Sequence, residues 1–177
     1  MTELDPTTLR RELLIEQGIE SQLNALVKQA NKTAAILENH PRMEESQLRN
    51  LLNAAIDARS TEVVINFIRY QIARNGSAWG VAPGSFGHSV INDLNTVLPK
   101  WHKQALAFVA QQNNAPELTA ERSEKAMVRL MQLYLGYLNR AFYYAKKTND
   151  FASLGRVNAI TQAMEQGAAK TEEVRHG

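Results

Sequence analysis

Apolar residues recur every three or four positions along most of this chain, which is the spacing of one buried face of an α-helix. Alternating apolar and polar runs, the pattern of a half-buried strand, do not occur in the 177 residues. Asp5 followed by Pro6 is typical of a helix start. The stripe beyond it predicts one helix that ends at Asn39-His40-Pro41, with Gly18 as a point of interruption. The members of this stripe are Ile15, Ile19, Leu23, Leu26, Ala30, Ala34 and Leu37.

Two further helices are predicted in the next part of the chain. The first begins with Glu44 and Glu45, whose charges suit the positive end of a helix dipole. The second covers residues 63–74 after a cap at Ser60 or Thr61. Because this second helix is apolar nearly all round, we expect it to be the central, buried helix of the fold.

A glycine-rich segment over residues 75–87 interrupts the helical pattern and is predicted to be a long loop. It holds four of the nine glycines, together with Trp79 and Phe86. Loops of this length are usually functional or mobile. The two aromatic side chains could stack on nucleic-acid bases, or they could pack the loop onto the helices. Packing is the favoured alternative.

Three more helical segments follow the loop. A stripe over residues 91–108 predicts a helix that is kinked or divided at Pro99. Residues 119–147 carry the cleanest apolar stripe in the chain and predict its last strong helix. A weaker helix is expected over 150–166, and the tail 167–177 has no periodicity and is expected to be frayed.

These elements predict an all-α, single-domain helical bundle of five to seven helices. The length of 177 residues suits one domain with a proper core. Residues 1–41 are interpreted as an N-terminal helical extension and 43–149 as the core helical bundle with its Gly-rich loop 75–87. Residues 150–177 are interpreted as the C-terminal helix and the frayed tail.

Composition excludes several classes of protein and site. The chain has no cysteine, which excludes disulfide frameworks, thiolate nucleophiles, iron–sulfur clusters and zinc sites built on cysteine. Its acidic start does not resemble a signal peptide, and no stretch approaches the roughly 18 apolar residues of a membrane span. We therefore expect a soluble cytoplasmic protein without a membrane partner.

The formal net charge of +2 conceals an uneven distribution along the chain. Residues 1–62 hold 7 basic and 10 acidic side chains, whereas residues 63–149 hold 10 basic and 4 acidic ones. Residues 150–177 hold 3 and 4. Residues 125–149 contain five basic side chains and no acidic one. A middle of one sign favours a polyanionic partner.

The basic side chains of residues 119–147 are predicted to share the helix face opposite the apolar stripe, at about 100° per residue. A phosphate backbone, an acidic neighbouring subunit or plain solvent could each lie against such a face. Its members are Arg122, Lys125, Arg129, Arg140 and Lys147.

Three arginines outside that helix are also candidates for anion contacts. Arg69 lies on the narrow polar strip of an apolar helix, where it could hold a phosphate or form an internal ion pair with Asp57 or Glu62. Arg74, at the start of the glycine loop, could contact an anion or the negative end of its helix dipole. Arg49 flanks the apolar stripe of its helix, so its stem could pack while its guanidinium reaches outward.

Signals for an enzyme are weak. The four histidines, His40, His88, His102 and His176, are scattered, and no helical Glu-x-x-His or H-E-x-x-H spacing occurs. The glycine loop lacks the Gly-Lys-Ser/Thr ending of a phosphate-binding P-loop. We therefore predict no catalytic residue, no metal site and no cofactor.

Three runs of the sequence resemble the helical small subunit of type III CRISPR effector complexes, the Csm-type more than the Cmr-type. Residues 46–52 match a Ser/Thr-x-Leu-Arg helix start, and residues 65–76 match a following helix of aromatic-Leu-Arg-x-Arg type. Residues 134–147 resemble the aromatic and basic last helix of that family. The helix before Met43, the insertion Ser77–Gly87 and the sequence after Asp150 depart from the family pattern.

The resemblance implies a small, non-catalytic, RNA-binding subunit of an antiviral ribonucleoprotein. Several copies would line up along the backbone that carries the guide RNA, beside the other subunits, and contact the guide RNA/target RNA duplex chiefly through Arg and Lys. Arg49 and Arg69 match the family's arginines best, whereas Arg74 precedes Gly76 where the family's arginine usually follows its glycine. With the basic face of the last helix, the predicted RNA-binding residues are Arg49, Arg69, Arg74, Arg129, Arg140 and Lys147.

Two other functions remain open from the sequence. One is a structural adaptor whose basic stripe docks an acidic protein. The other is a DNA-binding regulator of helix-turn-helix type, built on the closely joined helices 44–58 and 61–74. The second of these helices is very apolar for a helix that lies in a major groove.

Overall fold

The computed structural model describes residues 5–112 and 117–155. These ranges contain eight α-helices, one 3-10 helix (η1), one π-helix (η2) and a helical turn at residues 152–155, and no strand. The all-α prediction is therefore confirmed. The elements are α1 (Pro6–Glu20), α2 (Leu23–Ala35), η1 (Ile36–Asn39), α3 (Glu45–Asp57), α4 (Thr61–Arg74), α5 (Gly76–Trp79), α6 (Phe86–Asn92), η2 (Asp93–Val97), α7 (Leu98–Ala110) and α8 (Ala120–Thr148).

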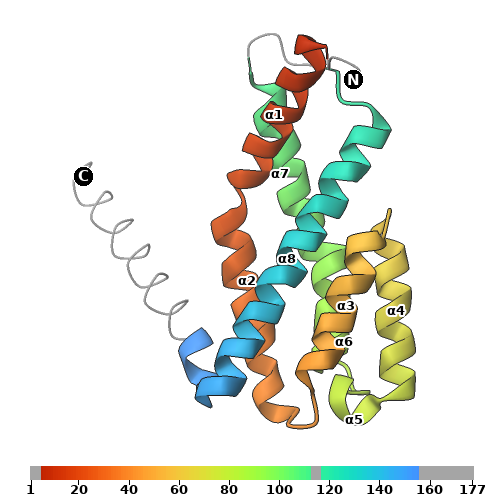
Figure 1. The fold of residues 1–177 in the computed structure, drawn as a ribbon, viewed down its shortest axis with the longest axis vertical. Helices are drawn as coiled ribbons and strands as arrows, with labels where there is room; N and C mark the ends of the chain where they lie inside the picture. Colours follow the sequence, from red (N-terminus) through yellow and green to blue (C-terminus); the bar gives the residue numbers. More distant parts are fainter. Residues whose placement is uncertain (1–4, 113–116, 156–177) are drawn as a thin grey trace, which may run out of the picture.

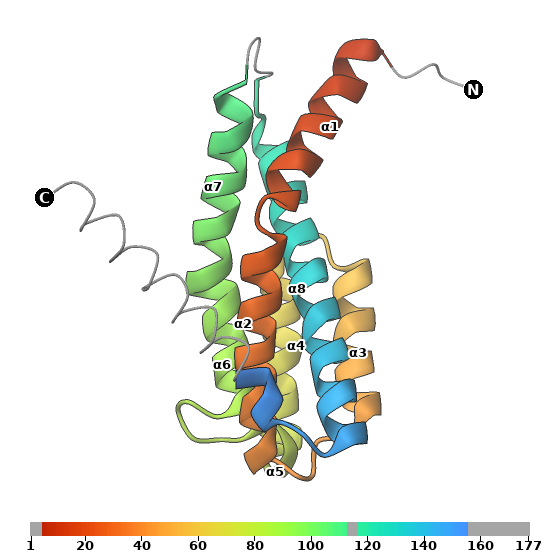
Figure 2. The same ribbon diagram turned by 90° about the vertical axis from the view of Figure 1, so that its left-hand side faces the viewer.

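The central element is α8, a helix of 29 residues. Figure 1 shows α2 and α3 on either side of it, with α4 outermost beyond α3, and Figure 2 shows α6 and α7 on the other side of α2. Nine side chains of α8 are buried in one hydrophobic core. The same core contains Leu26, Ala30, Ala34 and Leu37, so the segment predicted as an N-terminal extension contributes to it directly.

The prediction that helix 63–74 is the central, buried helix is wrong. It forms α4 at the edge of the bundle, where Val63 and Tyr70 are 56% and 55% exposed. The opposite side of α4 packs on α3, α5 and α6, and only one apolar face is needed for that contact. An apolar residue on the other face therefore gains no burial from this fold.

The single helix predicted before Pro41 is divided into α1 and α2 at Ser21 and Gln22. α1 packs against α7, whereas α2 packs along α8. Gly18 makes the first contact close, because a Cβ there would lie 2.5 Å from the carbonyl oxygen of Ala105 on α7. Gly18 was predicted as a point of interruption, and the break follows it within one turn.

The helix predicted to be kinked or divided at Pro99 is interrupted just before that residue by a π-helix, η2 (Asp93–Val97). The η2 segment separates α6 from α7, and Pro99 lies in the first turn of α7. Proline lacks the N–H that an α-helix would bond to the carbonyl four residues earlier, and a π-helical insertion adjusts the backbone at such a point.

The glycine-rich segment is more ordered than the loop predicted for residues 75–87, since α5 and the start of α6 lie within it. Gly80 and Gly84 adopt positive φ angles of 78° and 81°, a region that favours glycine. Trp79 and Phe86 are fully buried with ring centroids 5.7 Å apart. The aromatic side chains therefore pack the segment onto the bundle, and the favoured alternative is confirmed.

Two segments predicted near the C-terminus lie partly or wholly outside the residues that the structure describes. Of the helix predicted over 150–166, residues 150–151 are not helical, residues 152–155 are helical, and residues 156–166 fall outside the described residues, as does the tail 167–177. None of the helices described combines the length and the apolar character that crossing a membrane requires.

Candidate nucleic-acid interface

Most basic side chains of α8 contact carboxylates. Arg129 Nε lies 3.4 Å from Glu16 Oε1 on α1, and Lys147 Nζ lies 2.9 Å from Glu45 Oε1 on α3. Lys146 Nζ donates hydrogen bonds to Glu44 Oε2 at 3.0 Å and to the carbonyl oxygen of Met43 at 2.7 Å. Residues 125–149 contain no acid, and the partners of Arg129, Lys146 and Lys147 are thus supplied by α1 and by the start of α3. The basic face predicted for α8 is largely paired.

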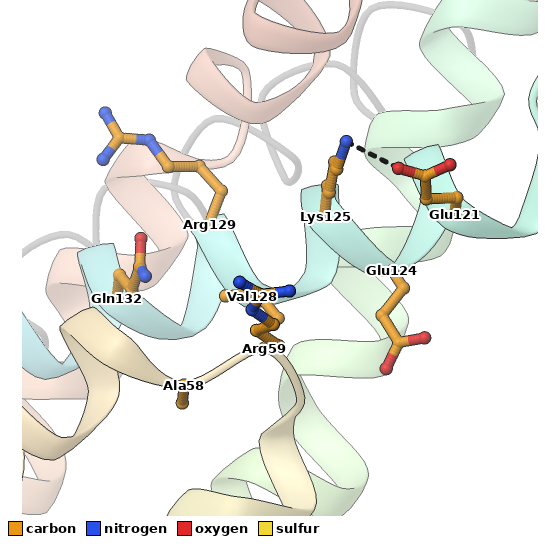
Figure 3. Close-up of a pocket in the computed structure, with 8 residues that line it drawn as sticks. All are labelled: Ala58, Arg59, Glu121, Glu124, Lys125, Val128, Arg129 and Gln132. Carbon is orange, nitrogen blue, oxygen red and sulfur yellow. Dashed lines mark ion pairs between the residues drawn. The ribbon is translucent and has the colours of Figure 1, made fainter.

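A groove of about 520 Å³ beside the N-terminal half of α8 shows the same mixture of charges (Figure 3). Lys125 is turned toward Glu121, with Nζ 2.7 Å from Oε1, and Arg129 is turned away from that pair. The hydrogen bond from Lys125 lowers the pKa of Glu121. The lining residues are Ala58, Arg59, Glu121, Glu124, Lys125, Val128, Arg129 and Gln132. Because both signs line it, this groove does not favour a polyanion.

Arg49 and Arg69 occupy equivalent levels on the α3–α4 hairpin. Arg49 precedes and Arg69 follows Arg59 in the turn by ten residues, and the two helices pack antiparallel (Figure 1). Each therefore lies eight residues, or about 12 Å, along its helix from the end nearer the turn. Both are exposed, and neither forms an ion pair within the part of the chain that the structure describes. The alternative of an internal pair between Arg69 and Asp57 or Glu62 is therefore not found.

The contacts between α3 and α8 place Arg140 at the same level. Gln132 Nε2 donates to the carbonyl oxygens of Ala55 and Ile56 near the end of α3, and Lys147 pairs with Glu45 at its start. These two contacts align residues 132–147 of α8 with residues 45–56 of α3. Arg140 is about midway along the first stretch and Arg49 is near the middle of the second, so the two arginines lie at about the same level. We call Arg49, Arg69 and Arg140 the arginine band.

Arg49 and Arg140 also share one side of the α3–α8 pair. Arg49 follows Glu45 by one helical turn, and Arg140 precedes Lys147 by two turns, so each lies on the face that carries its half of the Lys147–Glu45 contact. Arg140 forms no ion pair within the described ranges, and its guanidinium carbon lies 5.6 Å from the ring centroid of Tyr137. A guanidinium over a tyrosine ring keeps its charge and its outer donors available.

Local features of the sequence fix the positions of the α3 and α4 arginines. A capping box starts α3, in which the backbone N–H of Glu44 donates to Gln47 Oε1 at 2.8 Å. Arg74 ends α4, and its Nη1 donates to the hydroxyl of Tyr70 at 3.4 Å. Arg74 is exposed and lies more than one turn beyond Arg69. Of the six predicted RNA-binding residues, Arg129 and Lys147 contact a carboxylate, whereas Arg49, Arg69, Arg74 and Arg140 have no acid partner among the described residues.

The buried carboxylate of Asp93 was missed by the sequence analysis. Its Oδ1 accepts a hydrogen bond from Gln29 Nε2 at 2.8 Å, and its Oδ2 accepts from Thr33 Oγ1 at 2.6 Å and from the Tyr134 hydroxyl at 2.5 Å. Burial raises the pKa of Asp93, although these hydrogen bonds oppose the rise, and burial raises the pKa of Tyr134 well above its usual value. The cluster joins α2, η2 and α8. The signal for it in the sequence was an acid within the helical segment predicted over residues 91–108.

Exposed tyrosines on α8 were also missed. Tyr143 and Tyr144 are 52% and 48% exposed, and Lys147 Nζ lies 5.3 Å from the ring centroid of Tyr143. In the part of the chain that the structure describes, the most exposed aromatic side chains are these two and Tyr70 of α4, while Trp79 and Phe86, which the sequence suggested for stacking, are buried.

Comparison of the chain with protein-family models, with curated proteins and with solved structures finds no match. The likeness of runs 46–52, 65–76 and 134–147 to type III small subunits stays a prediction from sequence. What the fold adds is that the best-matched arginines of the first two runs, Arg49 and Arg69, lie level with Arg140 of the third.

Proposed function

We propose that this protein is a non-catalytic, RNA-binding small subunit of a type III CRISPR ribonucleoprotein, which lines the guide-RNA/target-RNA duplex in antiviral defence. The observation that supports this proposal best is the arginine band. Arg49, Arg69 and Arg140 come from three neighbouring helices, lie at one level and lack acid partners among the described residues, whereas Lys125, Arg129, Lys146 and Lys147 each contact a carboxylate.

Arginines held this way suit the backbone of a duplex. Base pairing with the guide supplies the sequence specificity of such a complex, so the protein needs only contacts to backbone and shape. The axes of packed helices lie about 8–10 Å apart. The three arginines of the band, each on a different helix, are therefore spaced across the surface that α8, α3 and α4 form. The planar guanidinium donates two parallel hydrogen bonds to phosphate oxygens. The band therefore supplies contacts that do not depend on sequence.

Repetition along the RNA would compensate for the small number of contacts in each subunit. Binding to the phosphate backbone releases counterions and weakens steeply with salt. When several copies lie on one RNA, the effective concentration of each is raised by the others. We expect weak binding by the isolated chain and firm binding within an assembly.

The test is recovery of the native assembly through a tag on this chain. The proposal predicts RNA of uniform length, several copies of this chain per RNA, and protection of the bound RNA from nuclease. Recovery of an acidic protein without nucleic acid would instead favour the adaptor, and preference for one duplex DNA sequence would favour the regulator. Either result would contradict the proposal.

A further inference from the structure

Gly136 lies in the middle of α8 with open space where a side chain would be. A Cβ built there meets no atom within 4 Å. Glycine inside a helix is less favourable than alanine, because it loses more backbone freedom on folding. Packing among the described residues therefore gives no reason for a glycine at this position.

At two other positions, close packing between helices does explain a glycine. A Cβ on Gly18 would lie 2.5 Å from the carbonyl oxygen of Ala105, and one on Gly87 would lie 2.7 Å from Cγ1 of Ile72. Both allow two helices of this chain to approach closely. Gly136 leaves the same close access to its backbone, and no described residue fills the space beside it, although Gln132 and Lys147 on the same side of α8 contact α3.

The residues that follow Gly136 give this face a chemical character. Arg140 is one helical turn later and has no acid partner in the described ranges. Tyr143 is one turn beyond Arg140 and is 52% exposed. An accessible stretch of backbone, a guanidinium and an aromatic ring thus succeed one another along the open side of α8.

We propose that this face binds a single-stranded segment of RNA. The sugar–phosphate backbone passes over Gly136, Arg140 donates to a phosphate, and one base stacks on Tyr143. Stacking on a side chain needs an unpaired base, because both faces of a paired base are covered by its neighbours. This inference rests on the proposed function for the nature of the nucleic acid, and it adds an unpaired segment beside the duplex.

The first test fills the space at Gly136. The full chain with Gly136→Gln is compared with Ala107→Gln, which adds the same side chain at an exposed position of α7. Binding to fluorescent single-stranded RNA and to duplex RNA is measured at low salt. We expect Gly136→Gln to weaken single-strand binding about tenfold, with an unchanged or higher melting temperature, while duplex binding and the Ala107→Gln protein stay within about twofold of the wild type.

The second test concerns stacking. Tyr143→Ala should weaken single-strand binding about tenfold, and Tyr143→Phe should restore it, since the ring and not the hydroxyl carries the contact. Wild-type affinity for single strands in both Gly136→Gln and Tyr143→Ala would overturn the inference, as would binding of duplex RNA alone. If the wild-type chain and its assembly bound neither form of RNA, the proposed function itself would fall.

Discussion

Lys147 Nζ on α8 lies 2.9 Å from Glu45 Oε1 at the start of α3, and that hydrogen bond raises the pKa of Lys147. With the contact between Arg129 and Glu16, it shows where the charges of the chain meet. The acidic first third and the basic middle are folded against each other. Among the described residues, this pairing divides the basic side chains of α8 into those that contact an acid and those, such as Arg140, that do not.

Removing the paired cations should change RNA binding little. In the double variant Arg129→Ala/Lys147→Ala, we expect affinity for duplex RNA within about twofold of the wild type, because these charges are already balanced by carboxylates. Solvent screens each of these exposed pairs, so the free energy of unfolding should also change little. Fluorescence anisotropy with labelled RNA and urea unfolding measure the two quantities. A tenfold loss of affinity would show that the pairs open to meet RNA.

The Asp93 cluster predicts a pH dependence of stability. Because burial raises the pKa of Asp93 above 3.8, the folded state holds its proton over a range in which the unfolded state has released it. The free energy of unfolding therefore falls as the pH rises through that range, and it becomes level above the folded-state pKa. The Asp93→Asn variant lacks this contribution.

Urea unfolding of both proteins at pH values from about 3.5 to about 7.5, a range that includes ordinary and raised carboxyl pKa values, measures the difference in their free energies of unfolding. The stability advantage of the wild type over Asp93→Asn should shrink as the pH rises. An advantage that grows with pH would mean that the three hydrogen bonds outweigh burial and hold the carboxylate ionised.

Two glycines predict opposite effects of the same substitution. Gly18→Ala should destabilise the fold by about 1–3 kcal/mol, because its Cβ would overlap the carbonyl oxygen of Ala105 and force α1 away from α7. Gly136→Ala should stabilise the fold by about 0.5–1 kcal/mol, since its Cβ enters open space on a helix. Thermal unfolding followed by circular dichroism measures both. Equal shifts in the two variants would contradict the packing described for α1 and α7.

Local signals in the sequence predicted several helices well. The last strong helix was expected over 119–147 and is α8 (Ala120–Thr148), and the helix that begins at Glu44 and Glu45 is α3. Caps and apolar periodicity depend on residues close together in sequence, so a single chain reveals them. The same local signals place the arginines of these helices relative to the apolar face, so the sequence could identify them as candidate surface residues.

Features that depend on neighbours in space could not be predicted in this way. The apolar surface of residues 63–74 suggested a buried helix, but only the packing of α3 and α6 decides that Val63 and Tyr70 stay exposed. The pairing of Arg129 with Glu16 likewise requires the register of α1 on α8. For that reason the sequence could not separate paired cations from unpaired ones.

The most direct test of the central claim compares two double variants over a range of salt concentrations. Arg49→Ala/Arg69→Ala removes two members of the arginine band, and Arg129→Ala/Lys147→Ala removes two paired cations as the matched control. The account predicts that the first variant keeps its helical circular dichroism and loses most duplex RNA affinity. The slope of log K against log salt is negative, and its magnitude should decrease by about two in that variant and stay unchanged in the control. Wild-type affinity and slope in Arg49→Ala/Arg69→Ala, or equal losses in the two variants, would contradict it.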